Sequence, residues 1–329
     1  MSPPTAVTIG NFDGVHAGHR ALIARCRQHA GPKSQTGGRV VVLAFDPHPA
    51  ANLPGREPPA CLTTFDRRAE LLRDAGADDV RRLDPDASLL ALTPEQFLDH
   101  VSREFAPKVI VEGNDFRFGK GRAGTIDGLR TIGTALGFKV DIVGPVEIAL
   151  TDHTVVRASS TTARWLIENG RIADAAQILG RPHAITGTVV RGEQLGRTIG
   201  FPTINVDTDI ALPADGVYAA HAHLPNEAVL PAAVNVGTRP TVNGLARRFE
   251  AHLLGLPTSL GGAWAHLPDL PEYGWPIRVE PIAWIRDQVR FPSIHALKDQ
   301  LARDCARVTG LIETFDTVRT NDLPQETPA

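Results

Sequence analysis

The sequence predicts an α/β protein in which an N-terminal doubly wound parallel sheet is followed by a C-terminal antiparallel β-barrel and a terminal helix. Three observations lead to this prediction. In the first part of the 329-residue chain, β-branched runs alternate with helical patterns, as in βαβ units. From Ala184 onward, short apolar runs are separated by Gly and Pro, which is typical of an antiparallel barrel. After Ser293, one face of a final helical pattern carries Leu297, Leu301, Cys305 and Val308.

The first half of the chain holds the alternating elements. The most specific helix start is at Thr93, where an N-cap Thr, a Pro at N1 and a Gln at N3 occur together. The run 40–45 is apolar throughout, as expected for a strand that is covered on both faces. Strands are expected at 6–9, 39–45, 80–83, 108–112 and 139–143, and helices at 22–26, 65–75, 94–105, 126–136, 159–169 and 172–179.

The second half shows the barrel pattern. We place the domain boundary after Pro182, because the apolar periodicity changes there. This gives domains at 1–182 and 183–312 and a polar tail at 313–329, disordered from about Asn321. Strands are expected at 184–191, 217–224, 232–236, 248–254 and 277–285.

The composition excludes several classes of function. The net charge is −3 and no long basic run occurs, so we expect no binding to nucleic acid or to anionic membranes. The N-terminus lacks the pattern of a signal peptide, and no stretch approaches the roughly 18 apolar residues of a membrane span. Cys26, Cys61 and Cys305 are odd in number, far apart and without a C-x-x-C, which favours a reduced, cytoplasmic protein.

The stretch 8–20 is the strongest candidate site. Apolar residues lead into a turn rich in Gly and Asp, and His16 and His19 follow at the expected start of a helix. Unpaired N–H groups at a helix N-terminus attract anions, and imidazoles can donate hydrogen bonds to phosphate oxygens. Gly10 and Gly14 would let the backbone approach a ligand closely. A metal site and a pair of solvated histidines remain alternatives on spacing alone.

Two further segments of the first half are candidates. Ser160, Thr161 and Arg164 begin a helix, and together they could hold a triphosphate, although a Ser or Thr there is often only a cap. In the loop 114–122, Phe116 and Phe118 flank an arginine, which suits stacking on a flat heterocycle. A flexible turn is the alternative for that loop.

The second half contains a glycine-rich arm and a strand carboxylate. Four glycines occur within residues 187–200, and Thr203 and Asn205 follow, so a cradle for phosphate and Mg²⁺ is plausible. Glu250 lies in an expected strand. It is a candidate general base if it faces inward, and an ordinary surface carboxylate if it faces solvent.

These motifs occur in the order that is found in one family. They are Gly10–His19, Phe45–Pro49, Gly113–Gly119, Ser159–Arg164, Gly196–Asn205, Val234–Thr241 and Arg286–Asp304. Over residues 6–310 the chain resembles the prokaryotic bifunctional riboflavin kinase/FMN adenylyltransferase family, or FAD synthetases. The resemblance implies that the barrel phosphorylates riboflavin with MgATP to give FMN. It implies that the N-terminal nucleotidyltransferase domain then transfers AMP from ATP to FMN, giving FAD and pyrophosphate.

The resemblance also implies residue roles. His16 and His19 would contact the ATP phosphates, and Glu250 would be the base on the riboflavin hydroxyl. In the adenylyltransferase, Gly10, Phe12, Asp13, Gly14, Asn114, Asp115, Ser160, Thr161 and Arg164 would bind ATP, while Phe45, Pro47, His48, Pro49 and Phe116 would border the flavin. In the kinase, Gly187, Gly192, Gly196, Arg197, Gly200, Pro202, Thr203 and Asn205 would bind ATP, with Thr203 and Asn205 also arranging Mg²⁺.

The chain departs from the family pattern in several places. Arg191 stands where His is more frequent, and Ala158 where a larger apolar residue is usual. Gly255 replaces an Asp, and an insertion that extends to Glu272 could reshape the flavin entrance of the kinase. Two alternatives remain: a nucleotidylyltransferase for another cofactor, and a flavin-binding module without catalysis. Transfer of flavin to client apoflavoproteins is compatible with the family, but no motif indicates it.

Overall fold

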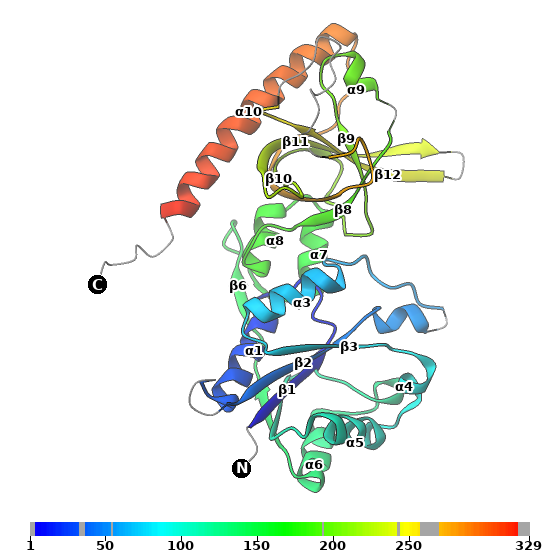
Figure 1. Ribbon diagram of the computed structural model, residues 1–329, viewed down its shortest axis with the longest axis vertical. Helices are drawn as coiled ribbons and strands as arrows, with labels where there is room; N and C mark the ends of the chain where they lie inside the picture. Colours follow the sequence, from blue (N-terminus) through cyan, green and yellow to red (C-terminus); the bar gives the residue numbers. More distant parts are fainter. Residues whose placement is uncertain are drawn as a thin grey trace. The chain divides into compact units, whose positions relative to one another are not determined.

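The computed structural model describes residues 4–32, 37–53, 55–192, 194–241, 244–256 and 270–321. The chain forms two compact units, each of which is visible in Figure 1. The first unit comprises residues 1–163 and 177–180, and the second comprises 164–176 and 181–329. The expected boundary at 182/183 differs from this division in that residues 164–176 belong with the second unit. In that unit, Ala214 donates its backbone N–H to the carbonyl of Ile167 (3.2 Å).

The first unit is built on a five-stranded parallel sheet, as predicted. The strand order changes direction between β1 and β4, and these two strands pair only at Ala6–Val109 and Val7–Ile110. In doubly wound sheets, ligands bind beyond the carboxyl ends of the strands at such a switch point. The strands are β1 (Thr5–Gly10), β2 (Arg39–Phe45), β3 (Asp79–Leu83), β4 (Val109–Gly113) and β5 (Lys139–Val143), in the order β3-β2-β1-β4-β5.

Helices cover both faces of this sheet, which explains why a central strand such as β2 is almost entirely apolar. Val40 and Val42 belong to one buried cluster together with residues of α1 (Ala17–Ala30) and α3 (Phe65–Asp74). Val41 and Leu43 belong to the opposite cluster, which includes residues of α5 (Pro94–Phe105) and α6 (Ile126–Leu136). The predicted capping box at Thr93 is present. Smaller elements are η1 (Pro49–Asn52), α4 (Ala87–Ala91), η2 (Lys120–Arg122), and the hairpin of β6 (Glu147–Ala149) and β7 (Val155–Arg157).

The second unit is a closed six-stranded antiparallel barrel, which confirms the predicted fold class. Along two neighbouring strands, every second residue is buried, including Val234 and Ala251, which are fully buried. The residues on either side of each of these along its strand face outward. Strand β9 was not predicted as a separate strand. The strands are β8 (Ile185–Val190), β9 (Ile204–Asp207), β10 (Gly216–His223), β11 (Val229–Thr241), β12 (Gly244–Leu253) and β13 (Pro276–Arg286), in the order β10-β11-β12-β9-β8-β13.

The helices of the second half include α7 (Ser160–Glu168), α8 (Ile172–Leu179), α9 (Leu195–Thr198) and α10 (Ile294–Asn321). Ser293 caps α10, as predicted, because its hydroxyl accepts the N–H of Ala296. The predicted polar tail at 313–329 is wrong for residues 313–321, which continue this helix. They are held there because Phe315 packs near His221 of β10 and Asp316 forms an ion pair with the same histidine (3.0 Å). Residues 322–329 lie outside the described part of the chain.

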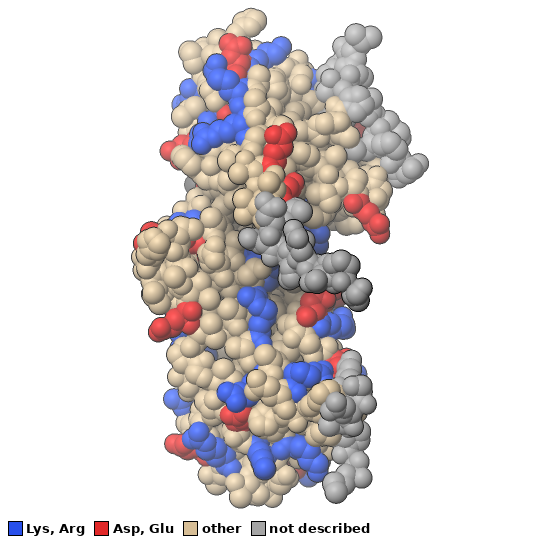
Figure 2. All heavy atoms as spheres, turned by 90° about the vertical axis from the view of Figure 1, so that its left-hand side faces the viewer, with Lys and Arg blue, Asp and Glu red and all other residues tan. Residues whose placement is uncertain are grey.

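The other general expectations concern cysteines, membrane spans and surface charge. Cys26, Cys61 and Cys305 are all free thiols. Among the described residues, no helix has the length and apolar character needed to cross a membrane. On the face that Figure 2 shows, basic and acidic side chains are interspersed, in keeping with the small net charge.

Candidate active sites

The first site is a pocket of about 230 Å³ at the switch point of the parallel sheet, here named the histidine pocket. His16 and His19 line it from the start of α1, opposite residues that follow β4 and β5. Their rings stack with centroids 3.6 Å apart, and Phe12 packs against His19 at 5.0 Å. The lining residues include Ile9, Gly10, Phe12, His16, Gly18, His19, Glu112, Gly113, Asn114, Asp115, Phe116, Arg157 and Ser159.

Both histidines are neutral near pH 7. Burial, assisted by the charges of Arg20 and Arg157, lowers the pKa of His16 to about 4. Burial and the adjacent His16 hold the pKa of His19 well below its usual range. The Nδ1 of His16 accepts the N–H of Gly18 (3.1 Å), so its neutral ring carries the proton on Nε2. That N–H can donate to an anionic ligand in the pocket.

Asp13 and Gly14 do not line the histidine pocket, so their expected role as phosphate contacts stays a prediction. The Asp13 carboxylate accepts the N–H groups of Leu62 and Thr63, both at 3.0 Å, and the Thr63 hydroxyl. Gly14 donates its N–H to Thr63 Oγ1, and a Cβ at this position would lie 2.8 Å from Leu62 Cδ1. These two residues therefore fix the turn against the loop at 62–63, and through it they act on the shape of the pocket.

The start of α7 contributes less to this pocket than the sequence suggested. Ser159, which was not a predicted ligand, lines the pocket and caps the helix by accepting the N–H of Thr162 (3.0 Å). Ser160 donates its hydroxyl to the carbonyl of Asp13 (2.7 Å), so this hydroxyl ties α7 to the β1 turn. Thr161 is exposed and outside the lining, and Arg164 belongs to the second unit.

A second pocket of about 380 Å³ adjoins the first, and we name it the loop pocket. As predicted, Phe45, His48, Pro49 and Phe116 come together here, whereas Pro47 is absent from the lining. Both rings of the expected stacking pair line this pocket. Phe118 is only 5% exposed and stacks on Phe116 at 5.4 Å, so Phe116 offers the more accessible ring. The lining also includes the cations of Arg56, Arg117 and Arg122.

The histidine and loop pockets have a common wall, because Ile9, Gly10, Asp115 and Phe116 line both. The sequence reasoning missed Glu112, a buried acid at the end of β4. Its Oε1 accepts the N–H of Ile9 (2.6 Å), and burial raises its pKa well above the usual range. The sequence does contain a signal for it, namely a charged residue directly after the apolar run 109–111.

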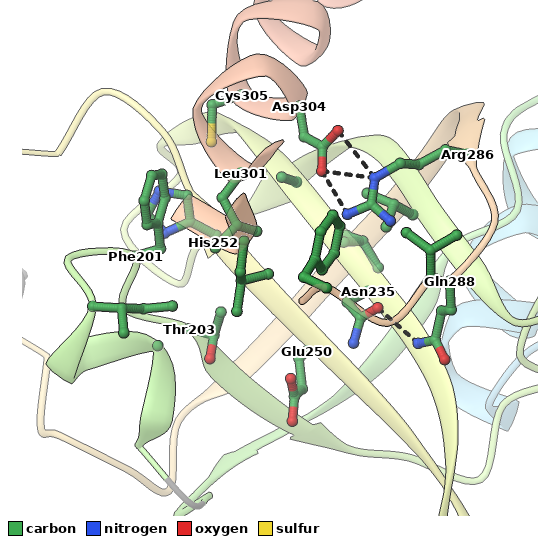
Figure 3. Close-up of a pocket in the computed structure, with 18 of the residues that line it drawn as sticks. Phe201, Thr203, Asn235, Glu250, His252, Arg286, Gln288, Leu301, Asp304 and Cys305 are labelled. Carbon is green, nitrogen blue, oxygen red and sulfur yellow. Dashed lines mark hydrogen bonds and ion pairs between the residues drawn. The ribbon is translucent and has the colours of Figure 1, made fainter. Parts of the chain in front are cut away.

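The third pocket, of about 350 Å³, lies against the outer face of the barrel beside α10 (Figure 3), and we name it the glutamate pocket. Strand register places Asn205 of β9 opposite Glu250 of β12, and Glu250 opposite Asn235 of β11. Since these positions alternate with buried residues, the three side chains form a row across three strands on the outer face. Glu250 therefore lines a pocket, which favours its interpretation as a base over an ordinary surface carboxylate.

Side chains at the end of β13, just after it and on α10 complete the glutamate pocket, and the sequence did not predict their role. Gln288 donates to Asn235 Oδ1 (2.8 Å), and Arg286 forms a two-pronged ion pair with Asp304 (2.7 and 3.1 Å) (Figure 3). His252, two residues after Glu250, pairs with the carbonyl of Pro202 (2.6 Å). Burial lowers the pKa of His252. The lining includes Gly196, Phe201, Thr203, Asn205, Asn235, Glu250, His252, Arg286, Gln288, Leu301, Asp304 and Cys305.

The fourth pocket, of about 340 Å³, adjoins the glutamate pocket at Asn205, and we name it the arginine pocket. Gly192 lines it, and a Cβ at that position would lie 1.9 Å from Asn205 Nδ2, so glycine leaves space for the amide. Gly187 lines neither pocket, and a Cβ there would meet the carbonyl of Asp207 at 2.2 Å. This glycine therefore allows close strand packing, and its expected ligand role stays a prediction. The lining is Val190, Arg191, Gly192, Asn205, Val206, Asp207, Arg247, Arg248 and Phe249.

The remaining predicted kinase residues lie in α9 and on its connection to β9. Gly200 has a positive φ of 86°, and Arg197 forms an ion pair with Glu272 (3.0 Å). Pro202 contributes the carbonyl that His252 contacts. Most of the insertion, residues 257–269, is outside the described part of the chain, so its expected effect on the flavin entrance stays a prediction.

The fold and the two pairs of pockets define a two-domain enzyme for phosphoryl and nucleotidyl transfer. The family model described as FAD synthetase matches residues 1–159, and the model described as riboflavin kinase matches residues 179–312. The chain belongs to the bifunctional riboflavin kinase/FMN adenylyltransferase family. It is an enzyme with both of these activities, and ATP is its co-substrate.

Individual relatives support this membership along nearly the whole chain. The chain is 38% identical to the bifunctional riboflavin kinase/FMN adenylyltransferase of Escherichia coli K12, over 91% of this chain and 90% of the relative. It is 32% identical to that of Haemophilus influenzae, over 91% of both chains. A solved structure described as a macrolide-efflux protein from Streptococcus pneumoniae has a TM-score of 0.78 and 28% identity, over 94% of this chain and 95% of that chain.

Proposed function

We propose that each unit carries out one of the two reactions: the parallel-sheet unit adenylylates FMN to FAD, and the barrel unit phosphorylates riboflavin to FMN. One observation carries this proposal. Each unit has two adjoining pockets with a common wall, as a transfer between two bound substrates requires. The residues matched by the two family models support the same assignment.

In the adenylyltransferase unit, ATP would occupy the histidine pocket and the flavin ring the loop pocket. Phe45, His48, Pro49 and Phe116 offer apolar and aromatic surface, while arginines at the same pocket favour an anionic substrate such as FMN. A phosphate oxygen of FMN attacks the α-phosphorus of ATP, and the bond from that phosphorus to the β-phosphate oxygen breaks to release pyrophosphate. Asn114 and Asp115 would position the nucleotide.

Neutral histidines suit this reaction, because no proton has to be moved onto a leaving pyrophosphate. His16 would donate from Nε2 to a phosphate oxygen whose charge grows during transfer, and His19 would support it through the stacked ring. Thr161, near the start of α7, is proposed to contact the β- and γ-phosphates. No covalent intermediate with the enzyme is needed.

In the kinase unit, riboflavin would occupy the glutamate pocket and ATP the arginine pocket, so that the substrates meet at Asn205. The Glu250 carboxylate would take the proton from the 5′-hydroxyl of riboflavin as the oxygen attacks the γ-phosphorus and ADP leaves. The row of Asn205, Glu250 and Asn235 supports this role, because the base lies on the strand next to the residue common to both pockets.

The residues of this unit fit Mg²⁺ that is bound together with ATP. In the part of the chain that the structure describes, no group of three or more His, Cys, Asp or Glu side chains could hold a metal alone. Mg²⁺ commonly takes one or two protein oxygens and fills its other positions with phosphates and water. We propose that Thr203 and Asn205, both of which line the glutamate pocket, supply those oxygens. When bound, the ion neutralises charge on the transferred phosphate.

Matched variants test the assignment of one reaction to each unit. We expect His19→Ala to reduce FAD formation from FMN by about 100-fold or more and to leave FMN formation unchanged. Glu250→Gln should reduce FMN formation to a similar degree and leave FAD formation from supplied FMN unchanged. The controls are His100→Ala and Glu227→Gln, because both side chains are exposed. Flavins separated by chromatography give the rates, and equal loss of both reactions in either variant would contradict the assignment.

A further inference from the structure

Arg68 of α3 is a buried cation that joins three separate segments of the first unit. It is only 4% exposed and lines none of the four pockets. Its Nη1 donates to the carbonyls of Asn11 (3.1 Å) and Phe45 (3.0 Å), and its Nη2 donates to the carbonyl of Thr63 (3.2 Å). These acceptors follow β1, end β2 and precede α3, so one guanidinium holds three chain segments together.

Two carboxylates balance the buried charge. Asp13 Oδ1 lies 3.9 Å and Asp46 Oδ1 lies 3.7 Å from Nη2 of Arg68. Asp13 also holds the loop at 62–63, as described above, and Asp46 approaches Arg82 (3.5 Å). A buried cation is costly unless several partners satisfy it, and Nη1 and Nη2 of Arg68 have such partners, whereas its buried Nε has none. The cluster therefore ties the ends of β1 and β2 to α3 through two of the three guanidinium nitrogens.

The segments that Arg68 joins carry the walls of both adenylyltransferase pockets. Asn11 and Phe45 line the loop pocket. Phe12, the neighbour of Asn11, lines the histidine pocket and packs on His19. A shift of the β1 end relative to the β2 end would thus change the spacing between the two pockets.

We propose that Arg68 is a positioning residue for FAD formation, which sets the spacing between bound FMN and ATP by joining the ends of β1 and β2. This inference rests on the proposed function of the first unit. A displacement of about 1 Å between reacting groups can reduce a rate by about 100-fold. Lysine keeps the charge, but its single nitrogen cannot reproduce the fork that serves three carbonyls.

The test compares Arg68→Lys and Arg68→Met with Arg67→Lys and Arg67→Met. Arg67 is the matched control, because it is the adjacent residue of α3. It forms an ion pair of 2.8 Å with Glu70, whose side chain is largely exposed. The readouts are kcat and the separate KM values for FMN and ATP in FAD formation, riboflavin phosphorylation in the same samples, and hydrogen exchange across residues 5–45. We expect kcat/KM for FAD formation to fall about 10- to 100-fold in both Arg68 variants.

A positioning role and a purely structural role give different kinetics. A less stable but otherwise normal site lowers the active fraction, which reduces kcat and leaves both KM values unchanged. We expect KM for FMN to rise at least 5-fold in folded Arg68→Lys, with phosphorylation and the Arg67 variants unchanged. Unaltered KM values, or lost exchange protection in both Arg68 variants, would overturn the proposal. If the unaltered enzyme forms no FAD from FMN, the proposed function itself fails.

Discussion

Replacing His16 by Asn should make the first unit less sensitive to acid. His16 is 7% exposed and accepts the Gly18 N–H as the N-cap of α1. Because the pKa of its imidazole is lowered to about 4, the folded protein resists protonation of this ring. An unfolded histidine titrates near its ordinary pKa of 6.5. Asn keeps a capping side chain but has no group that titrates in this range.

The size of the effect follows from these two pKa values. Between pH 6.5 and 4 the unfolded chain binds more protons at this position than the folded chain, so stability falls as the pH falls. From pH 7 to pH 4, the difference between pKa 6.5 and about 4 corresponds to about 3 kcal/mol of unfolding free energy. His19, whose pKa is also lowered, adds a loss of the same sign that the His16→Asn variant retains.

Hydrogen exchange measures this loss locally. Peptides that cover α1 should be followed between pH 7 and pH 4 by mass spectrometry, with correction for the intrinsic exchange rate. We expect the protection free energy of the unaltered protein to fall by about 3 kcal/mol more than that of His16→Asn. His100→Asn is the control, because this exposed histidine of α5 should leave the acid loss unchanged. Equal acid losses in the unaltered protein and His16→Asn would refute the reasoning.

Two predictions concern the barrel unit. Asp304→Asn removes the charge that faces Arg286 at 2.7 Å, and since the Asp304 side chain is only 3% exposed, we expect about 3 kcal/mol lower barrel stability. Tryptophan fluorescence in urea should report this, because Trp165, Trp275 and Trp284 all lie in this unit, and an unchanged midpoint would contradict it. Chelation with EDTA should abolish riboflavin phosphorylation, and excess Mg²⁺ should restore it, whereas turnover that persists without metal would exclude the proposed role of Thr203 and Asn205.

The sequence predicted the parallel sheet well, because central strands such as β2 and β4 are buried on both faces and contain continuous apolar runs. It predicted the start of α5 residue by residue, because the capping box is a local pattern. Strand β9 was missed because it has only four residues and follows Pro202, which reads as a turn. The helical extent of α10 was missed because its last turns are held by contacts with His221, and such contacts have no local signal.

The candidate sites likewise contain residues that local sequence reveals and residues whose role depends on contacts made in the fold. The histidines could be found from the sequence because their neighbours form a recognisable motif, and Glu250 because it is a carboxylate within an expected strand. Asn235 and Asp304 lie within the family motifs, but their place in the glutamate pocket could not be predicted, since strand register and a distant helix bring them there. Asp13 looked like a ligand because it lies within the motif. Its carboxylate is used by backbone groups 49 and 50 residues away in the chain.

The central claim is that the two reactions occur in separate pockets of one chain. Its most direct test mixes His19→Ala with Glu250→Gln and supplies riboflavin and MgATP, with each variant alone as a control. We predict that His19→Ala alone stops at FMN and that Glu250→Gln alone leaves riboflavin unchanged. The mixture should form FAD, because FMN made by one molecule can be adenylylated by the other. Formation of FAD from riboflavin by either variant alone, or no FAD in the mixture, would contradict the claim.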